Sequence, residues 1–252
     1  MILTHRRALI TGGGQGVGQG IAIALAKEGA SVAITGRNLA KLEKTCKMIE
    51  AIGGKAFAIE NDVKDLDSLE KTVKQAVSAL GGLDILVNNA QQVPLGSLFD
   101  VDEKSLEAGW QSGPLACFRL MKLCHPHLKA SGNASIVNLA STAAKRWDSS
   151  GYGAYAAVKE AIRAITRAAA CEWAVDGIRS NVILPHAKSP GLEWWIENYP
   201  EQAEAFIQSI PMKRIGDCEQ DIGRFVASLC SDTSAYINGQ SIAVDGGQAF
   251  MG

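Results

Sequence analysis

The chain has 252 residues, a formal net charge of −1 and 20% charged residues. This length suits one large α/β domain, and the near-neutral charge argues against nucleic acid or an anionic membrane surface as a partner. We therefore expect a single domain over residues 1–252 whose partner is a small molecule, with no nucleic acid and no membrane.

Short apolar segments alternate with amphipathic stretches along the whole chain. Each short segment is flanked by turn-forming residues, which is typical of a buried strand. About seven strands are predicted, at residues 8–11, 32–35, 56–60, 85–87, 135–139, 180–184 and 241–244. Strands joined by helices run parallel with right-handed crossovers, so the sequence predicts a single-domain α/β, Rossmann-like, doubly wound parallel sheet with helices on both faces. Ligands then bind at the carboxyl ends of the strands.

Two of the connecting stretches show a clear helical period. Apolar residues fall on one face in residues 39–49 and again in residues 66–80. Asn38 and Asp65 are predicted N-caps, and Gly53 and Gly81 are predicted C-terminal stops.

The cysteines and the N-terminus indicate the compartment. The six cysteines include no Cys-x-x-Cys pair and no cluster with His at metal spacing, so we expect reduced thiols and no metal. The apolar stretch after Arg6 and Arg7 is shorter than a signal peptide requires, and no window approaches 18 apolar residues. We expect a cytoplasmic protein.

A glycine-rich turn joins the first predicted strand to a helix. Strand, glycines and helix come in the order that a dinucleotide site requires, because the backbone must turn sharply and approach a pyrophosphate. The candidate cofactor residues here are Gly12, Gly14, Gln15, Gly16, Val17 and Gly18.

The glycine spacing and a series of later motifs resemble the short-chain dehydrogenase/reductase family over nearly the whole chain. The motifs, in order, are Gly12, Gly16 and Gly18, Asp62-Val63, Asn88-Asn89-Ala90, Ser141, Tyr155 with Lys159, and Asp245-Gly246-Gly247. The resemblance implies an oxidoreductase that interconverts a secondary alcohol and a ketone, or an aldehyde or sugar carbonyl, by hydride transfer with NAD(P).

The cofactor preference depends on the end of the second strand. An acidic residue there would bind the ribose hydroxyls of NAD, but this chain has Arg37, which can bind a 2′-phosphate, with Asn38 assisting. Gln15 is neutral where many NADP-preferring members carry a second basic residue. We expect NADP(H), with NAD(H) as the alternative. The resemblance adds Asp62, Val63, Asn89, Ala90, Tyr155, Lys159 and Pro185 to the cofactor site, and assigns Asn88 to bracing the strands.

The candidate catalytic residues are Ser141, Tyr155 and Lys159. Carbonyl reduction needs a proton donor at the carbonyl oxygen, and lowering the pKa of a tyrosine from about 10 to about 7 takes about 4 kcal/mol. Lys159 lies one helical turn after Tyr155, and an ammonium about 6 Å away supplies about 2.8 kcal/mol of it. In the family the tyrosine is the acid/base, the lysine holds the ribose and the serine steadies the carbonyl. Tyr152 has no lysine at this spacing.

Three positions depart from the family pattern. Gly113, followed by Pro114, stands where a helix of the family carries an active-site asparagine that positions a water. We expect a kink there whose freed Trp110 carbonyl holds this water. Gln91 replaces a glycine near the nicotinamide, and His186 replaces the glycine of a Pro-Gly pair, where it either reaches the substrate or is a solvated loop histidine.

The candidate substrate residues lie in the loops after the predicted strands and in a lid-like segment at about 186–212. They are Gln91, Lys145, Trp147, His186 and Trp194. Within this segment, residues 191–206 read as an amphipathic lid. In the loops, Lys145, Arg146 and Lys188 either attract a polar or anionic substrate or form a solvated rim. The substrate itself is left open.

Family members commonly form tetramers, and the alanine-rich helix at 155–175 permits close packing between subunits or against its own sheet. We expect a homotetramer, or a homodimer. Gly113 and Gln91 also motivate a second hypothesis, a catalytically impaired NADP-binding sensor or structural subunit, although such a protein does not need Ser141. An epimerase or lyase is a third hypothesis, and the chain leaves no room for the larger substrate domain of such relatives.

Overall fold

The computed structural model describes residues 1–146 and 149–251, and within them it contains one parallel sheet of seven strands. The strand order is β3-β2-β1-β4-β5-β6-β7. The strands are β1 (Arg7–Thr11), β2 (Ser31–Gly36), β3 (Lys55–Glu60), β4 (Ile85–Asn88), β5 (Ala134–Leu139), β6 (Ile178–Pro185) and β7 (Ser241–Val244). All seven predicted strands are confirmed to within two residues at each end. The order reverses between β1 and β4, which is where ligands bind in such sheets.

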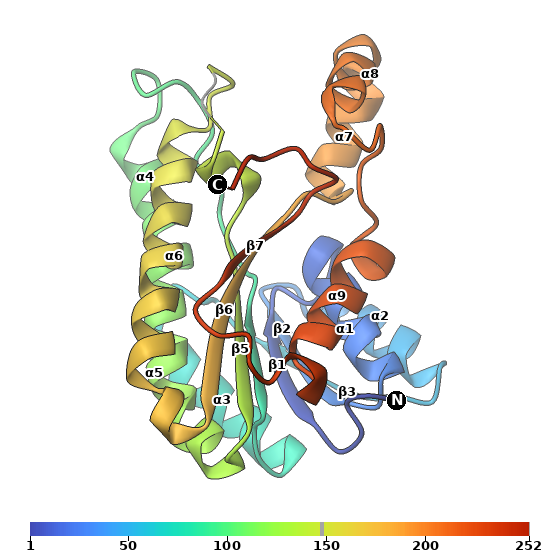
Figure 1. Cartoon of the computed structure of the whole chain (residues 1–252), viewed down its shortest axis with the longest axis vertical. Helices are drawn as coiled ribbons and strands as arrows, with labels where there is room; N and C mark the ends of the chain where they lie inside the picture. The colour runs from blue at the N-terminus through green and yellow to red at the C-terminus, as the bar shows by residue number, and fades with distance from the viewer. Residues whose placement is uncertain (147–148, 252) are drawn as a thin grey trace.

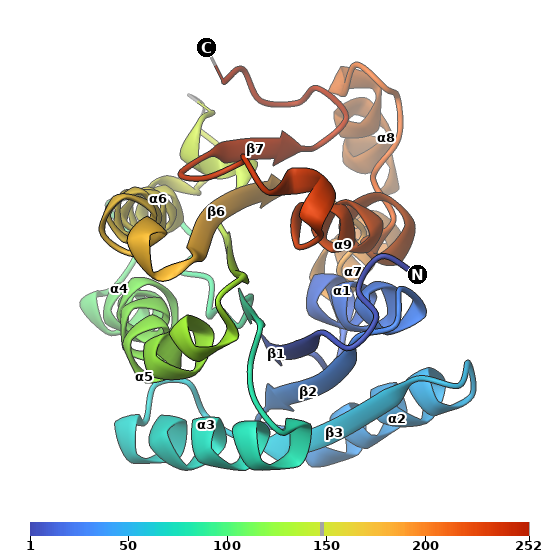
Figure 2. The same cartoon turned by 60° about the horizontal axis from the view of Figure 1, so that its bottom comes forward.

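Helices cover both faces of this sheet, as Figures 1 and 2 show. One face carries α1 (Gly16–Lys27), α2 (Leu39–Glu50) and α9 (Arg224–Leu229). The other carries α3 (Leu66–Leu80), α4 (Glu103–Trp110), α5 (Ala116–Ser131) and α6 (Gly153–Glu172). The lid-like segment forms α7 (Pro190–Asn198) and α8 (Pro200–Ser209), which stand beyond the carboxyl edge of the sheet at the top of Figure 1.

The central strands are buried on both faces, which explains why they read as continuous apolar runs. In β1, Ala8 and Ile10 pack toward α1, whereas Leu9 packs into the core on the opposite face. Burying one such large apolar side chain stabilises the fold by about 1.5–3 kcal/mol. The two cores therefore hold the sheet rigid beneath its carboxyl edge.

The helix ends follow the predicted caps. The Asn38 side chain accepts a hydrogen bond from the N–H of Lys41, and Asp65 accepts from the N–H groups of Asp67 and Ser68. Gly81 ends α3 in a left-handed conformation. The lid segment contains two helices, and Pro200 begins the second of them.

A backbone contact that the sequence did not indicate joins α1 to a π-helical turn at Cys218–Gly223. A Cβ atom on Gly20 would lie 2.3 Å from the carbonyl carbon and oxygen of Cys218. A Cβ on Gly223 would lie 2.5 Å from the carbonyl oxygen of Gly20. The two glycines therefore allow these segments to touch backbone to backbone.

We expect Gly20→Ala to lower the free energy of unfolding by about 2 kcal/mol, because the overpacking exceeds the gain in helix propensity. Gly191→Ala is the matched control, since nothing lies within 4 Å of its added Cβ. Urea unfolding measures both variants, and equal stabilities would contradict the contact.

Candidate active site

The glycine turn after β1 is packed tightly against the loop that follows β4. Gly12 and Gly16 adopt left-handed conformations with φ of 69° and 56°. A Cβ on Gly18 would lie 2.3 Å from the Gly12 carbonyl oxygen and 2.4 Å from Nδ2 of Asn89. Nδ2 of Asn89 in turn donates to the carbonyl oxygens of Thr11 at 2.8 Å and Gly12 at 3.2 Å. Side chains at these glycine positions would push the two loops apart.

The turn forms one wall of a cavity of about 420 Å³ at the reversal point of the sheet. Most of the predicted cofactor residues border this cavity. They are Gly12, Gly14, Gln15, Gly16, Val17, Arg37, Asn38, Asp62, Val63, Asn89 and Ala90. Gly18 packs beneath them. The other three predicted cofactor residues are not in the cavity lining: Tyr155 and Lys159 lie on α6, and Pro185 ends β6 in register with Val244.

The glycine-turn end of the cavity suits the pyrophosphate of a dinucleotide. The first turn of α1 begins at Gly16 and contains no acidic residue, so its free N–H groups can receive a pyrophosphate. Ser189 and Pro190, which the sequence analysis missed, close the other side, with Cδ of Pro190 3.2 Å from the Cβ position of Gly16. Lys41 and Ser112 also border the cavity and were not predicted.

Asn88 links the strands below the cavity, as predicted. Its Nδ2 donates to Oδ1 of Asn138 at 2.7 Å, and Nδ2 of Asn138 donates to Oγ1 of Thr166 at 2.9 Å. This buried chain of hydrogen bonds joins β4, β5 and α6.

The three candidate catalytic residues come together where β5 and α6 meet. Ser141 follows the end of β5, and Tyr155 and Lys159 lie one turn apart on α6. Nζ of Lys159 donates to the carbonyl oxygen of Leu139 at 2.7 Å, which ties α6 to the end of β5. The same Nζ lies 5.5 Å from the centre of the Tyr155 ring. Tyr152, the rival tyrosine, is exposed, and its ring lies 6.1 Å from that of Tyr155.

Burial governs the pKa values of this group. It raises the pKa of Tyr155 to about 12, against the opposing effect of a hydrogen bond with Ser141. It lowers the pKa of Lys159 to about 8, because the residue is only 3% exposed. The expected lowering of the Tyr155 pKa by Lys159 is therefore not found in the free protein, since loss of hydration outweighs the attraction at this distance.

The unusual Gln91 and Gly113 occupy one space. A Cβ on Gly113 would lie 2.5 Å from Oε1 of Gln91 and 2.9 Å from Cγ1 of Val158. Nε2 of Gln91 donates to the carbonyl oxygens of Gln92 at 2.7 Å and Gly109 at 2.9 Å, which fixes the amide. The Gln91 side chain therefore fills the place that a side chain at position 113 would take.

The helix around Gly113 is irregular at the predicted place. The structure shows a π turn at Gln111–Leu115 that contains Pro114. In a π turn each N–H pairs with the carbonyl five residues back, and this shifted pairing accommodates a proline that cannot donate.

In the predicted substrate region, Phe206 of α8 contacts residues from three segments. The sequence analysis did not indicate Phe206 as a site residue. Its ring packs edge-on against His186 at 5.4 Å and Trp195 at 5.7 Å, and the Arg146 guanidinium lies 5.8 Å from its centre. Trp194, the predicted residue, instead faces Tyr199 and is 58% exposed. Lys145 is half-buried in the loop after Ser141, and Trp147 lies outside the described residues.

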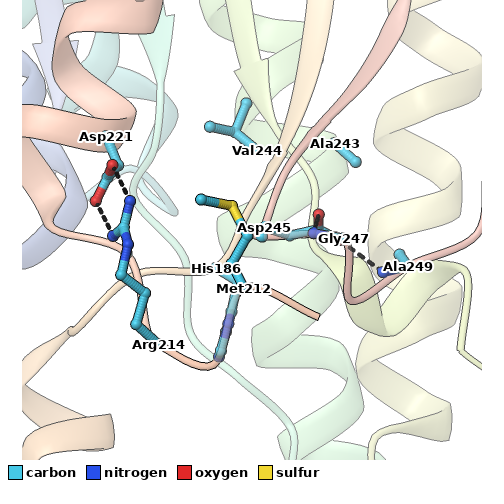
Figure 3. A pocket seen from close by; sticks show the side chains of 11 residues that line it. His186, Met212, Arg214, Asp221, Ala243, Val244, Asp245, Gly247 and Ala249 are labelled. Atoms are coloured by element: carbon cyan, nitrogen blue, oxygen red, sulfur yellow. Dashed lines mark hydrogen bonds and ion pairs between the residues drawn. The ribbon is translucent and has the colours of Figure 1, made fainter. Parts of the chain in front are cut away.

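His186 also borders a second cavity, of about 480 Å³ (Figure 3). Arg214 and Asp221 form a double hydrogen bond on one side of it, and Asp245 binds the N–H groups of Gly247 and Ala249 on the other. His186 does not border the cavity of the glycine turn.

Comparison with known proteins agrees with this geometry. A family profile described as enoyl-(acyl carrier protein) reductase matches residues 12–249. A 12alpha-hydroxysteroid dehydrogenase of Clostridium sp. is 40% identical over 98% of this chain and 97% of its own length. The chain belongs to the short-chain dehydrogenase/reductase family. It is an oxidoreductase that interconverts an alcohol and a carbonyl compound with a nicotinamide cofactor.

Other members of the short-chain dehydrogenase/reductase family match equally widely. A tropinone reductase homolog of Arabidopsis thaliana is 36% identical, with 97% of this chain and 92% of the relative covered. A solved 7 alpha-hydroxysteroid dehydrogenase complexed with NADH and 7-oxo glycochenodeoxycholic acid superimposes with a TM-score of 0.92 at 32% identity. The match covers 97% of this chain and 94% of that one.

Membrane-spanning helices, metal-binding clusters and disulfides are all absent from the described residues. None of the helices in residues 1–146 and 149–251 combines the length and hydrophobicity of a membrane span. Over the same residues, His, Cys, Asp and Glu side chains form no group of three that would hold a metal ion. All six cysteines are free thiols.

The buried Lys159 of this dehydrogenase gives a pH-dependent stability. Between pH 8 and 10.5 the folded protein loses this proton while the unfolded chain keeps it, so stability from this group rises with pH. We expect the difference in unfolding free energy between the wild type and Lys159→Met to shift in favour of the wild type by about 3 kcal/mol across this window. Urea unfolding at pH 7, 8, 9 and 10 measures it, and a constant difference would show that the lysine is not desolvated.

The Gln91 and Gly113 positions should be coupled. Gly113→Ala forces a Cβ against Oε1 of Gln91, so we expect it to destabilise the wild type by about 1 kcal/mol more than it destabilises a Gln91→Ala variant. Urea unfolding of the four proteins gives this coupling energy. Additive effects would mean that the two residues do not share the space.

Proposed function

We propose that this protein is an NADP(H)-preferring dehydrogenase that interconverts a secondary alcohol and a ketone, with Tyr155 as the acid/base. The observation that carries the proposal is the arrangement of Ser141, Tyr155 and Lys159 at the end of β5, in a sheet whose reversal point holds the glycine-turn cavity. A protein that only bound the cofactor would not need the serine in hydrogen-bond reach of the tyrosine.

The side chains act on the proton and on the carbonyl oxygen. Bound NADP(H) would supply or accept the hydride. The raised pKa keeps the Tyr155 hydroxyl protonated at neutral pH, so it is ready to donate to a carbonyl oxygen during reduction. Oγ of Ser141 accepts from the N–H of Ala143 at 3.2 Å, which orients its hydroxyl. Lys159 carries a positive charge at neutral pH that stabilises a tyrosinate once it forms.

The substrate class follows from the lid and from the names of the relatives. We propose a bulky, largely apolar alcohol or ketone of the hydroxysteroid type, since two similar proteins are named hydroxysteroid dehydrogenases. The aromatic contacts of Phe206 with His186 and Trp195 provide an apolar surface under the lid. Arg146, Lys145 and Lys188 lie in the loops nearby and would attract an acidic group on such a substrate.

We also propose a cytoplasmic homotetramer. Large apolar side chains are exposed on the catalytic-side helices: Leu106, Trp110 and Phe118. Beside them, α6 exposes a row of small residues: Ala157, Ala164 and Ala168. Both features support packing between subunits, and sedimentation velocity gives the number of copies.

We expect NADPH oxidation with 12-oxo or 7-oxo bile acids in a panel of ketones, and faster turnover with NADPH than with NADH. Tyr155→Phe should reduce kcat at least 1,000-fold, on the order of the acid/base contribution, while NADPH binding persists. Absorbance at neutral pH measures the rates, and cofactor fluorescence measures binding. A variant that turns over normally would remove Tyr155 from the mechanism, and a wild type that prefers NADH would overturn the cofactor assignment.

A further inference from the structure

We propose that Lys41 is the second cation of a 2′-phosphate subsite, opposite Arg37, and that Gln15 holds its ammonium in place before the cofactor arrives. This inference rests on the proposed NADP(H) preference and names the side chains that produce it. Nothing in the motif pattern of the sequence points to Lys41, because it lies in the first turn of α2 rather than in the glycine turn.

The first step of the argument is geometric. Nζ of Lys41 donates to Oε1 of Gln15, so the lysine crosses from α2 to the glycine turn. The stem of Lys41 lies over Gly14, with Cβ of Lys41 3.1 Å from where a Cβ on Gly14 would stand. Arg37, Asn38, Lys41 and Gln15 all border the same cavity. The ammonium is thus held at the wall of the cavity that Arg37 also borders.

The second step concerns charge. In the described part of the chain, neither Arg37 nor Lys41 forms an ion pair with a carboxylate, and the first turn of α2 contains no acidic residue. A phosphate monoester carries a charge of about −1.5 to −2 at neutral pH, so two cations are needed to neutralise it. The 2′-hydroxyl of NAD carries no charge and gains nothing from the second cation.

The third step concerns the orientation of Lys41. Asn38 accepts the N–H of Lys41 at 3.0 Å, which fixes the first turn of α2 and the direction of this side chain. Gln15 is a neutral acceptor, and a charged acceptor makes a stronger hydrogen bond with an ammonium. A phosphate therefore replaces Gln15 as the partner of Lys41 with a net gain, and the lysine moves little.

The test compares binding of cofactors and of their adenosine halves. Lys41→Met keeps the stem and removes the charge, Lys41→Arg restores a charge, and Lys47→Met is the matched control on an exposed position of the same helix. Dissociation constants for NADPH and NADH come from cofactor fluorescence, and those for 2′,5′-ADP and 5′-AMP come from calorimetry. Neither measurement depends on the substrate or on turnover.

We expect Lys41→Met to weaken NADPH and 2′,5′-ADP about tenfold, and to leave NADH and 5′-AMP within about twofold, as for loss of one charge-assisted hydrogen bond. Lys41→Arg should retain most of the affinity, and Lys47→Met all of it. Unchanged NADPH binding in Lys41→Met, or equal weakening of NADPH and NADH, would overturn the role of Lys41.

Arg37→Met separates this inference from the proposed function. If Arg37→Met weakens NADPH selectively while Lys41→Met does not, the NADP(H) preference stands and the role of Lys41 is wrong. If the wild type binds NADH more tightly and neither variant changes the ratio, the cofactor assignment itself fails, and the subsite with it.

Discussion

The contact between Asn89 and the glycine turn is the constraint on which the site depends. The Asn89 amide sits against Gly12 and Gly18 and donates to two carbonyl oxygens at the end of β1. Such an arrangement satisfies buried backbone acceptors and fixes the separation of two loops at once. Because β4 is continuous with the loop that carries Gln91, this contact also positions the π turn and the face of α6 at Val158.

Around this frame, the dehydrogenase places its titratable groups in a buried region. Lys159 is held by the carbonyl of Leu139, and its charge is retained at neutral pH in spite of burial. Burial also keeps the Tyr155 hydroxyl neutral. In a buried site, a charge that forms on the tyrosine oxygen interacts more strongly with the ammonium than it would in solvent. The free protein is therefore arranged for proton donation before any ligand binds.

Two departures from the family pattern are explained by pairs of residues far apart in sequence. Gly113 lacks a side chain because the Gln91 amide occupies that space, and neither residue alone indicates this exchange. Gln15 is neutral, yet the ammonium of Lys41 lies against it. In both cases a side chain from another element lies next to the position of the missing group.

The sequence by itself determined the strand and helix order, the parallel sheet and the glycine turn, and its resemblance to the family indicated Ser141, Tyr155 and Lys159 as candidate catalytic residues. The strands, helices and turn follow from local patterns, namely apolar runs, glycines and caps at Asn38 and Asp65. Only the tertiary structure decided that Lys41 reaches Gln15, that Gln91 fills the space at Gly113, and that Trp195 rather than Trp194 faces Phe206. The direction of the Tyr155 pKa shift also depended on burial, which a spacing of residues does not reveal. Contacts between side chains of different elements arise from packing in three dimensions, and hydrophobic periodicity within one segment carries no information about them.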